Sequence, residues 1–121
     1  MVVVTKLPKQ RQGTQTLLIR VLLINENGPW VAQGLDYDIA AQGRTIQEAM
    51  KAFQQTLLAQ IRADLSKGRN PLQDFEHAPD MYWSAYERAE PLQNRPILSL
   101  PQEVPPAFMI GAIYEELRVY S

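Results

Sequence analysis

The sequence contains no cysteine and a single histidine, His77, among its 121 residues. The lack of cysteine excludes disulfide bonds, thiol nucleophiles and thiolate metal ligands together. A zinc site or a nucleophilic triad also needs histidine, and one histidine between Glu76 and Ala78 provides too little material for either. We therefore predict a protein without a catalytic centre, a cofactor or a metal site, in which His77 is an ordinary loop residue.

Long apolar runs and an excess of one charge are missing as well. The first segment, MVVVTKLPKQRQG, has too short an apolar run for a secretory signal, and no later run approaches the length of a membrane span. The 12 lysines and arginines against 13 aspartates and glutamates give a formal charge of -1, so no overall field attracts nucleic acid or an anionic membrane. We expect a soluble, cytoplasmic protein without membrane contact.

What is present suffices for one ordinary hydrophobic core. Apolar residues make up 45% of the chain, and 121 residues is below the length at which chains usually divide into separate cores. We predict a flexible lead-in or edge strand over residues 1–15 and a single α+β domain over 16–121, with a C-terminal extension that begins near residue 69.

Turn signals and alternation predict a β-hairpin near the start of this domain. The segments TLLIRVLLIN and WVAQGLDY flank Asn27-Gly28, a pair favoured in tight hairpin turns, and IAAQG predicts a short third strand after the bend LDYD. On the first strand, one face carries Leu17, Ile19, Val21 and Leu23, and the other carries Leu18, Arg20, Leu22 and Ile24. One helix covers only one such face, so the second must meet a later part of the chain or another copy of the protein.

The stretch GRTIQEAMKAF predicts the start of one long helix. Thr45 and Glu48 form a capping box, in which the hydroxyl accepts from the N–H of Glu48 and the carboxylate reaches back to the N–H of Thr45. Helical spacing of apolar residues then continues for about twenty residues, to a stop at Lys67-Gly68. A glycine-led loop can also hold a phosphate, but Glu48 places a competing charge at the positive end of the helix, so we interpret the motif as structural.

The second half of the chain is rich in proline. Asp80 is the predicted N-cap of a short helix over DMYWSAYERAE, and PLQNRPILSLPQEVPP predicts an extended arm. The last segment, AIYEELRVY, alternates as a strand does, but its periodicity leaves residues 112–120 open between strand and helix. The expected fold is α+β: an antiparallel sheet of three to four strands in the order β-β-β-α-…-β, packed by one long helix, with a short second helix and a proline-rich arm.

The order of hairpin, short strand ending in glycine and Thr-x-x-Glu-Ala helix resembles the N-terminal domain of HicB-type antitoxins. The matching segments are NENGPWVAQGLDYD and AAQGRTIQEAMKAFQQTL, within the range from Leu17 to Leu65. The resemblance implies a curled antiparallel sheet backed by one helix, similar to a partial ribonuclease-H-like or double-stranded-RNA-binding-like layout, and it implies an oligomer. It also implies that the domain neutralises a small mRNA-cleaving toxin.

The resemblance does not extend to the second part of that family's pattern. In the family, a separate helix-turn-helix or ribbon-helix-helix segment binds the operator. After Gly68 this sequence has no two-helix pattern with a basic recognition helix. The resemblance therefore implies a stand-alone relative without a recognisable DNA-binding segment.

Three charged residues in or beside the apolar strands are candidates for a metal site, acid/base chemistry or an ion pair. Asp36 and Asp38 lie two apart at a strand end, where a divalent cation or an acid/base pair needs carboxylates, although polar residues at a bend are commonly solvated turn formers. Arg20, in the middle of an apolar strand, predicts either an ion pair with a carboxylate such as Glu115 or Glu116 or a side chain that reaches solvent.

Aromatic residues with methionine and interspersed arginine are typical of protein interfaces. The predicted partner-binding residues are Leu18, Arg20, Leu22, Trp30, Tyr37, Tyr82, Trp83 and Tyr86. The expected function is a non-catalytic interaction module that forms a homo-oligomer, a dimer or higher, and occludes a partner such as a small HicA-type toxin.

Two alternatives to this function remain at the level of the sequence. The first is a nucleic-acid-binding regulator that uses the aromatic residues with Lys6, Lys9 and Arg11 of the lead-in. The second is a degenerate metal-dependent nuclease that uses Asp36 and Asp38.

Overall fold

The computed structural model of the chain describes residues 15–25, 27–92, 97–98 and 110–120, with side-chain surroundings for all of these except 15–18, 97–98 and 110–115. The predicted lead-in over residues 1–15 therefore lies almost wholly outside the described residues, as does most of the predicted proline-rich arm. In chain order the elements are β1 (Gln15–Asn25), β2 (Trp30–Gly34), β3 (Ala40–Gly43), α1 (Ile46–Ser66), α2 (Asp80–Arg88), β4 (Glu90–Pro91), β5 (Ile97–Leu98) and β6 (Ile110–Tyr120).

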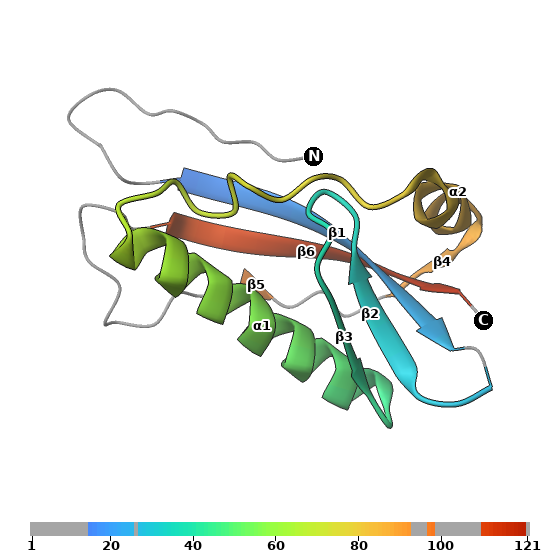
Figure 1. Cartoon of the computed structure of the whole chain (residues 1–121). Coiled ribbons are helices and arrows are strands. Elements are labelled where there is room, and N and C mark those ends of the chain that lie inside the picture. The colour runs from blue at the N-terminus through green and yellow to red at the C-terminus, as the bar shows by residue number, and fades with distance from the viewer. Residues whose placement is uncertain (1–14, 26, 93–96, 99–109, 121) are drawn as a thin grey trace.

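The strands form one mixed sheet in the order β3-β2-β1-β6-β4, and β5 also pairs with β6. Helix α1 runs along the sheet, and the shorter α2 lies at its other side (Figure 1). The predicted α+β class, with one long helix packed on a sheet, is confirmed. None of the helices in the described part of the chain combines the length and the apolar character that a membrane span requires.

The predicted hairpin and third strand are both present. β1 and β2 are antiparallel, with Val21 opposite Gly34, and β2 and β3 are antiparallel as well. The hairpin turn places Asn27 at a φ of 59°, a left-handed conformation that asparagine tolerates. The predicted bend between β2 and β3 closes through a hydrogen bond from the N–H of Gly34 to the carbonyl of Ile39, at 2.7 Å.

The final strand answers the question that periodicity left open for residues 112–120. β6 is a strand along its whole length and pairs with β1 in parallel, from Gln15 opposite Ile110 to Ile24 opposite Tyr120. The sheet is therefore mixed, a detail that the expectation of an antiparallel sheet missed. The physical reason is the connection: parallel neighbours need a long crossover, and the chain between β3 and β6 provides one that contains both helices.

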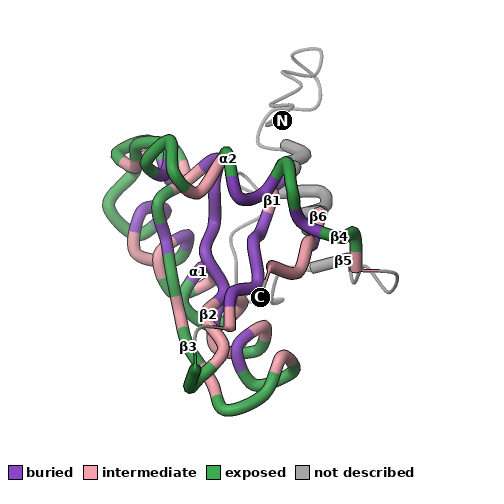
Figure 2. Tube along the Cα trace, turned by 90° about the vertical axis from the view of Figure 1, so that its right-hand side faces the viewer, coloured by how far each residue is buried: buried purple, intermediate pink, exposed green. Residues whose placement is uncertain are grey.

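The face of the sheet that meets α1 forms the larger apolar core. Phe53, Leu57 and Ile61 of α1 are at most 1% exposed, as the helical spacing predicts. Their partners on the sheet include Ile19, Val21, Leu23, Ala32 and Leu117. Figure 2 shows buried positions along β1 and much of β2, whereas the positions of β3 alternate between exposed and intermediate. The helix ends where predicted, with Lys67 as C-cap and Gly68 at a φ of 71°.

The start of α1 depends on a cap and on a close approach of the backbone. The hydroxyl of Thr45 accepts from the N–H of Glu48 at 3.1 Å, as predicted, but the Glu48 carboxylate accepts from the N–H of Arg44 at 3.1 Å rather than from that of Thr45. This backbone hydrogen bond and the Arg44 side chain hold the pKa of Glu48 below its ordinary value. Gly43 comes so close to the first turn that a Cβ atom there would lie 2.5 Å from the backbone nitrogen of Ala49.

The second face of the sheet is covered by a later part of the chain, one of the two expected solutions. Leu22 and Ile24 are 0% and 7% exposed, in a cluster with Leu35 and with Ala78, Ala85, Tyr86 and Ala89 from α2 and its flanks. Helix α2 begins one residue earlier than predicted: Pro79 is the N-cap, without a side-chain cap hydrogen bond, and Asp80 is the first helical residue. Proline cannot donate and fixes its φ, so it ends the preceding loop and leads into the helix.

The loop from α1 to α2 is fixed by a buried carboxylate. Asp64, near the end of α1, is 6% exposed, and its Oδ2 accepts from the N–H of Leu72 at 2.7 Å. Its Oδ1 accepts from the side-chain amide of Gln60 at 3.1 Å. Leu72 is completely buried and has a φ of 63°, an uncommon conformation for a leucine. The loop therefore leaves α1 in one defined direction, toward the second face of the sheet.

The approach of Gly43 to α1 predicts the effect of adding one methyl group. Gly43→Ala should lower the free energy of unfolding by about 1–3 kcal/mol, because the new Cβ atom meets backbone atoms that cannot rotate away. Gly28→Ala is the matched control, since nothing lies within 4 Å of a Cβ atom there; we expect a change within about 0.5 kcal/mol. Urea unfolding of both variants measures the difference, and equal stabilities would contradict the described approach.

Candidate partner-binding site

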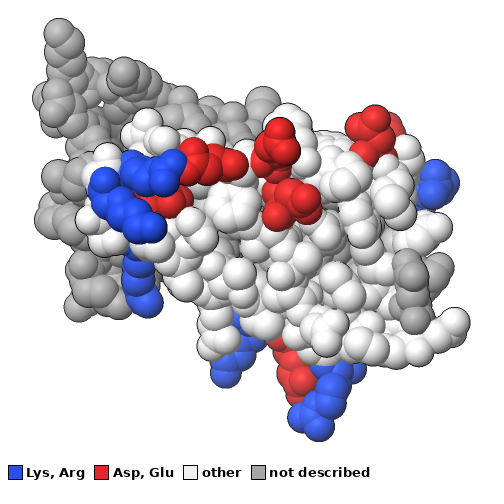
Figure 3. All heavy atoms as spheres, viewed as in Figure 1, with Lys and Arg blue, Asp and Glu red and all other residues white. Residues whose placement is uncertain are grey.

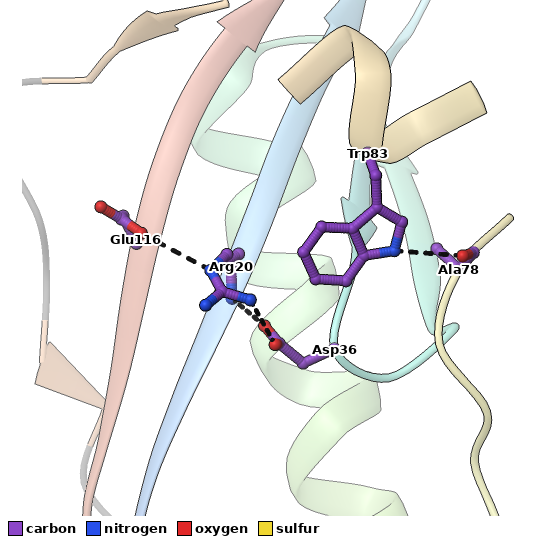
Figure 4. A network of polar contacts seen from close by, with 5 residues as sticks. All are labelled: Arg20, Asp36, Ala78, Trp83 and Glu116. Carbon is purple, nitrogen blue, oxygen red and sulfur yellow. Dashed lines mark hydrogen bonds and ion pairs between the residues drawn. The ribbon is translucent and has the colours of Figure 1, made fainter. Parts of the chain in front are cut away.

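Arg20 lies in the middle of β1 on the second face of the sheet (Figure 4). Its backbone N–H donates to Oδ2 of Asp36 at 2.8 Å, and its Nη1 donates to Oδ1 of the same residue at 2.8 Å. Its Nε lies 3.9 Å from Oε2 of Glu116 on β6. The predicted pairing with a carboxylate is confirmed for Glu116, but the closer partner is Asp36, which was not among the carboxylates predicted for Arg20.

The two carboxylates considered as a metal or acid/base pair have separate partners. Asp36 is 4% exposed, and both of its oxygens accept from Arg20. Asp38 is exposed, and its Oδ1 accepts from the side-chain amide of Gln33 at 2.8 Å. Among the described residues, no three histidine, cysteine, aspartate or glutamate side chains come together as potential metal ligands. Both aspartates therefore belong to the framework of the bend between β2 and β3.

Trp83 connects α2 to this framework. Its indole N–H donates to the carbonyl of Ala78 at 3.1 Å, and the guanidinium carbon of Arg20 lies 5.2 Å from its ring centroid. The ring of His77 is tilted against the indole at a centroid distance of 5.8 Å. His77 itself is an exposed loop residue, as predicted. The orientation of Trp83 is thus fixed from the loop before α2 and from β1 (Figure 4).

Tyr86 and Arg118 form a second contact of the same kind. The guanidinium carbon of Arg118, on β6, lies 4.8 Å from the ring centroid of Tyr86. Tyr86 is 6% exposed, and its hydroxyl and the Nε of Arg118 are buried without a hydrogen-bond partner in the described part of the chain. Burial and the neighbouring Glu116 carboxylate raise the pKa of Tyr86 to about 12.

A third such contact joins the end of α2 to the end of β6, where Arg88 lies 5.8 Å from the ring centroid of Tyr120. Each contact of a guanidinium with an aromatic face contributes about 0.5–1 kcal/mol at a partly exposed site. Helix α2 is therefore attached through aromatic and polar contacts as well as through apolar burial.

Five of the predicted partner-binding residues lie on the second face. Leu22 of β1 and Tyr86 of α2 are buried where the helix meets this face, while Arg20, Tyr82 and Trp83 are partly exposed. The structure brings these five together, because the loop after α1 returns the chain across β1. Only the partly exposed members offer a surface to another molecule.

The other three predicted residues do not join this group. Trp30 and Tyr37 pack against the core on the α1 side of the sheet. Burial, and to a smaller extent the charge of Asp36, raise the pKa of Tyr37. The side chain of Leu18 lies outside the described residues.

A shallow depression that the sequence analysis did not identify lies beside α2. It has a volume of about 260 Å³ and is lined by Ile24, Pro29, Val31 and Tyr82. Met81, which precedes Tyr82, is 68% exposed. Strand alternation could have found part of this set, because it places Ile24 on the same face as Leu22. The depression itself depends on where α2 crosses the hairpin, which no local pattern indicates.

Comparison with known proteins gives no relative: no family model, no curated protein and no solved structure matches this chain.

The contrast between two arginines tests the role of the Arg20–Asp36 pair. The side chain of Asp36 is 5% exposed, so Arg20→Met leaves a buried carboxylate without its cation and should cost about 3 kcal/mol of unfolding free energy. Arg44→Met is the control, since the Arg44–Glu48 pair is largely exposed and should change stability by less than about 0.5 kcal/mol. Chemical denaturation measures both. Similar losses in the two variants would refute the special role of Arg20.

The unpartnered hydroxyl of Tyr86 predicts a dependence on alkaline pH. Because the pKa is about 12 in the folded chain and 10.0 ordinarily, the unfolded chain loses the proton first, and stability falls as the pH rises from 10.0 to about 12. Tyr86→Phe should remove this part of the loss. At neutral pH the same variant should differ from the wild type by less than about 1 kcal/mol, because the hydroxyl makes no close hydrogen bond to another described residue.

Denaturant unfolding of the wild type and of Tyr86→Phe, at neutral pH and at several alkaline values, provides the measurement. A variant with an unchanged alkaline profile would show that another group titrates there. A large loss of stability at neutral pH would show that the hydroxyl has a partner.

Proposed function

We propose that this chain is a non-catalytic protein-interaction module, similar to HicB-type antitoxins, that associates with itself and occludes a surface of a partner protein such as a small mRNA-cleaving toxin. The observation that carries the proposal is the α2 side of the sheet. There, Tyr82 lines a depression together with Ile24, Pro29 and Val31. On the same helix, Met81 is exposed and Trp83 is partly exposed. Aromatic and methionine side chains in this state are enriched at protein interfaces.

The layout of the first half also supports the proposal. The antiparallel strands β3, β2 and β1 are backed by one long helix, which is the arrangement that the resemblance to HicB-type antitoxins implies. The capped helix entry after Gly43 belongs to the same segment.

The geometry of the charged residues favours occlusion over chemistry. Both oxygens of Asp36 accept from Arg20, and Oδ1 of Asp38 accepts from Gln33. These partners support a structural role for the two carboxylates over the nuclease alternative. A nucleic-acid-binding role would need aromatic faces on which bases stack. The ring of Trp83 already faces the Arg20 guanidinium, and that of Tyr86 is buried under Arg118.

The surface available for self-association is smaller than the apolar pattern of β1 suggested. Leu22 and Ile24 are covered by α2 of the same chain, so they do not require a second copy. Beyond α2, the second face continues to Arg20 and Glu116, whose side chains are 25% and 28% exposed. A second copy would therefore contact the part of this face that α2 leaves open, or another surface altogether.

Two measurements test the proposed function. Light scattering after size exclusion should give a mass above that of one 13.8 kDa chain, because the module associates with itself. Where a neighbouring reading frame encodes a short basic chain of the HicA type, co-purification should yield a complex in which cleavage of a reporter mRNA is suppressed. A monomer at high concentration that leaves the toxin fully active would refute the proposal.

A further inference from the structure

Strand β3 forms one edge of the sheet, and its sequence lacks the features that usually protect an edge. Its residues, AAQG, include no charged side chain and no proline, and it pairs with β2 without a register shift. Strand β4, at the other end of the strand order, consists of Glu90–Pro91, a charge and a proline, which both discourage further pairing. Of these two ends, β3 is therefore the one that accepts another strand.

The outer side of β3 presents backbone groups that have no partner in the described part of the chain. The N–H of Gly34 donates to the carbonyl of Ile39 at 2.7 Å, which fixes the alternation of the ladder between β2 and β3. By this alternation, the backbone groups of Ala41 face β2, whereas those of Ala40 and Gln42 point away from it. Both of these residues are exposed. The edge thus offers the N–H and carbonyl groups of Ala40 and Gln42 to a further strand.

The N–H groups at both ends of this edge are already engaged. The N–H of Asp38, two residues before the strand, donates to the carbonyl of Glu76 at 2.8 Å. The N–H of Arg44, the residue after the strand, donates to Oε1 of Glu48 at 3.1 Å. A further strand therefore finds free donors only at the two positions between them, and this restricts the register in which it can pair.

The two ends of the edge carry opposite charges. Asp38 is exposed, and Arg44 has a side chain that is 89% exposed. Each keeps a contact within its own chain, Asp38 with the side-chain amide of Gln33 and Arg44 with the carboxylate of Glu48. Figure 3, in the view of Figure 1, shows acidic side chains at the level of the bend before β3, side chains of both signs at the lower edge where β3 ends, and uncharged surface between them. The edge is thus acidic at its start and carries an exposed arginine at its end.

We propose that β3 is a self-association surface, on which a second copy of this chain adds its own β3 antiparallel and extends the sheet across a two-fold axis at Ala41. The inference rests on the proposed function and identifies the surface by which the module associates with itself. Pairing of this kind needs no exposed apolar face, so the cover that α2 gives to Leu22 and Ile24 does not oppose it.

Only one antiparallel register uses the free donors of both copies completely. With Ala41 opposite its own counterpart, Ala40 pairs with Gln42 of the second copy on both sides of the axis, and each pair exchanges two hydrogen bonds. A slide of two residues in either direction would bring Asp38 or Arg44 into such a pair, and their N–H groups are engaged. A slide of one residue would oppose the free groups of one copy to groups that face β2 in the other.

The same register also matches the charges. Asp38 lies opposite Arg44 of the second copy, and the two-fold axis repeats this pair at the other end. Opposite charges in a cross-strand pair favour one register over others, although exposed pairs add little affinity. The chain is therefore complementary to its own copy, whereas an unrelated extended peptide would meet this order of charges only by chance.

Proline at position 42 tests the pairing without disturbing the sheet of a single chain. The N–H of Gln42 points away from β2, and proline is tolerated at such an edge position. Gln42→Pro removes this donor from both copies and puts a ring in the path of the second strand, so the Kd of the dimer should rise by about tenfold or more. Gln42→Ala keeps the N–H and is the matched control, with an unchanged Kd. Sedimentation equilibrium of the full-length chain measures both, and circular dichroism verifies the fold.

Cysteine at the axis tests the register, and the natural absence of cysteine makes the result unambiguous. In Ala41→Cys the two thiols of a dimer face each other in a non-hydrogen-bonded pair, where the Cα atoms are about 4.5 Å apart and a disulfide can form. In Gln42→Cys and Ala40→Cys the two thiols are one diagonal step apart, about 7–8 Å, beyond the reach of a disulfide. Under mild oxidation, Ala41→Cys should give a covalent dimer at least about tenfold faster than the other two variants.

A charge exchange tests the pair at the ends of the edge. Asp38→Lys and Arg44→Glu each place like charges opposite each other and should raise the Kd of the dimer about five- to tenfold, because each dimer contains the pair twice. The double variant Asp38→Lys/Arg44→Glu restores opposite charges and should return the Kd to within about twofold of the wild-type value. Effects on the single chain would instead add up in the double variant.

The outcomes separate the β3 surface from the proposed function. A dimer that Gln42→Pro leaves intact would overturn the surface while self-association stands. Faster oxidation at position 40 or 42 than at position 41, or a double charge variant that associates more weakly than both single ones, would overturn the register. A wild-type chain that stays monomeric at high concentration would overturn the surface and self-association together, and suppression of a toxin by that monomer would leave only the occluding role.

Discussion

A single positive charge in the middle of an apolar strand is the constraint around which the second half of this fold is organised. Arg20 cannot be buried in β1 without a compensating charge. Asp36 reaches it from the bend after β2, and Glu116 reaches it from the parallel strand β6. Trp83 then covers the guanidinium from α2. The bend after β2, strand β6 and helix α2 thus each contribute one contact to the same side chain. These contacts help to hold the irregular chain between the helices over the second face of the sheet.

The two faces of the sheet are covered in physically different ways. The α1 layer is held by apolar contacts, with Phe53, Leu57 and Ile61 buried against the strands. The α2 layer combines small alanines with guanidinium groups on aromatic rings, and it contains the buried hydroxyl of Tyr86. A layer of the second kind tolerates water and charge at its edges. Under the proposed function, the α2 layer is the one that contacts another protein, and the α1 layer contributes stability.

The sequence predicted those parts of the fold whose signals lie within a few residues. The hairpin follows from Asn27-Gly28, and the long helix follows from its cap at Thr45 and its stop at Gly68. The pairs it missed are distant: Asp36 lies 16 residues from Arg20, and the register of β6 on β1 joins the two ends of the domain. The candidate site was only partly predictable, because composition groups Trp30 and Tyr37 with Tyr82, whereas the sheet separates them onto opposite faces.

The central position of β6 also has a consequence for how the protein is made. Residues 110–120 lie between β1 and β4, so a strand that is synthesised after both of its neighbours occupies an interior position in the sheet. The hairpin and α1 leave the ribosome with one side of β1 still lacking its hydrogen-bonding neighbour, and such an edge recruits other chains readily. Folding must then wait for a contact between distant segments, which is slow. The time that translation takes from the hairpin to residue 120 is therefore time during which β1 keeps an unpaired edge.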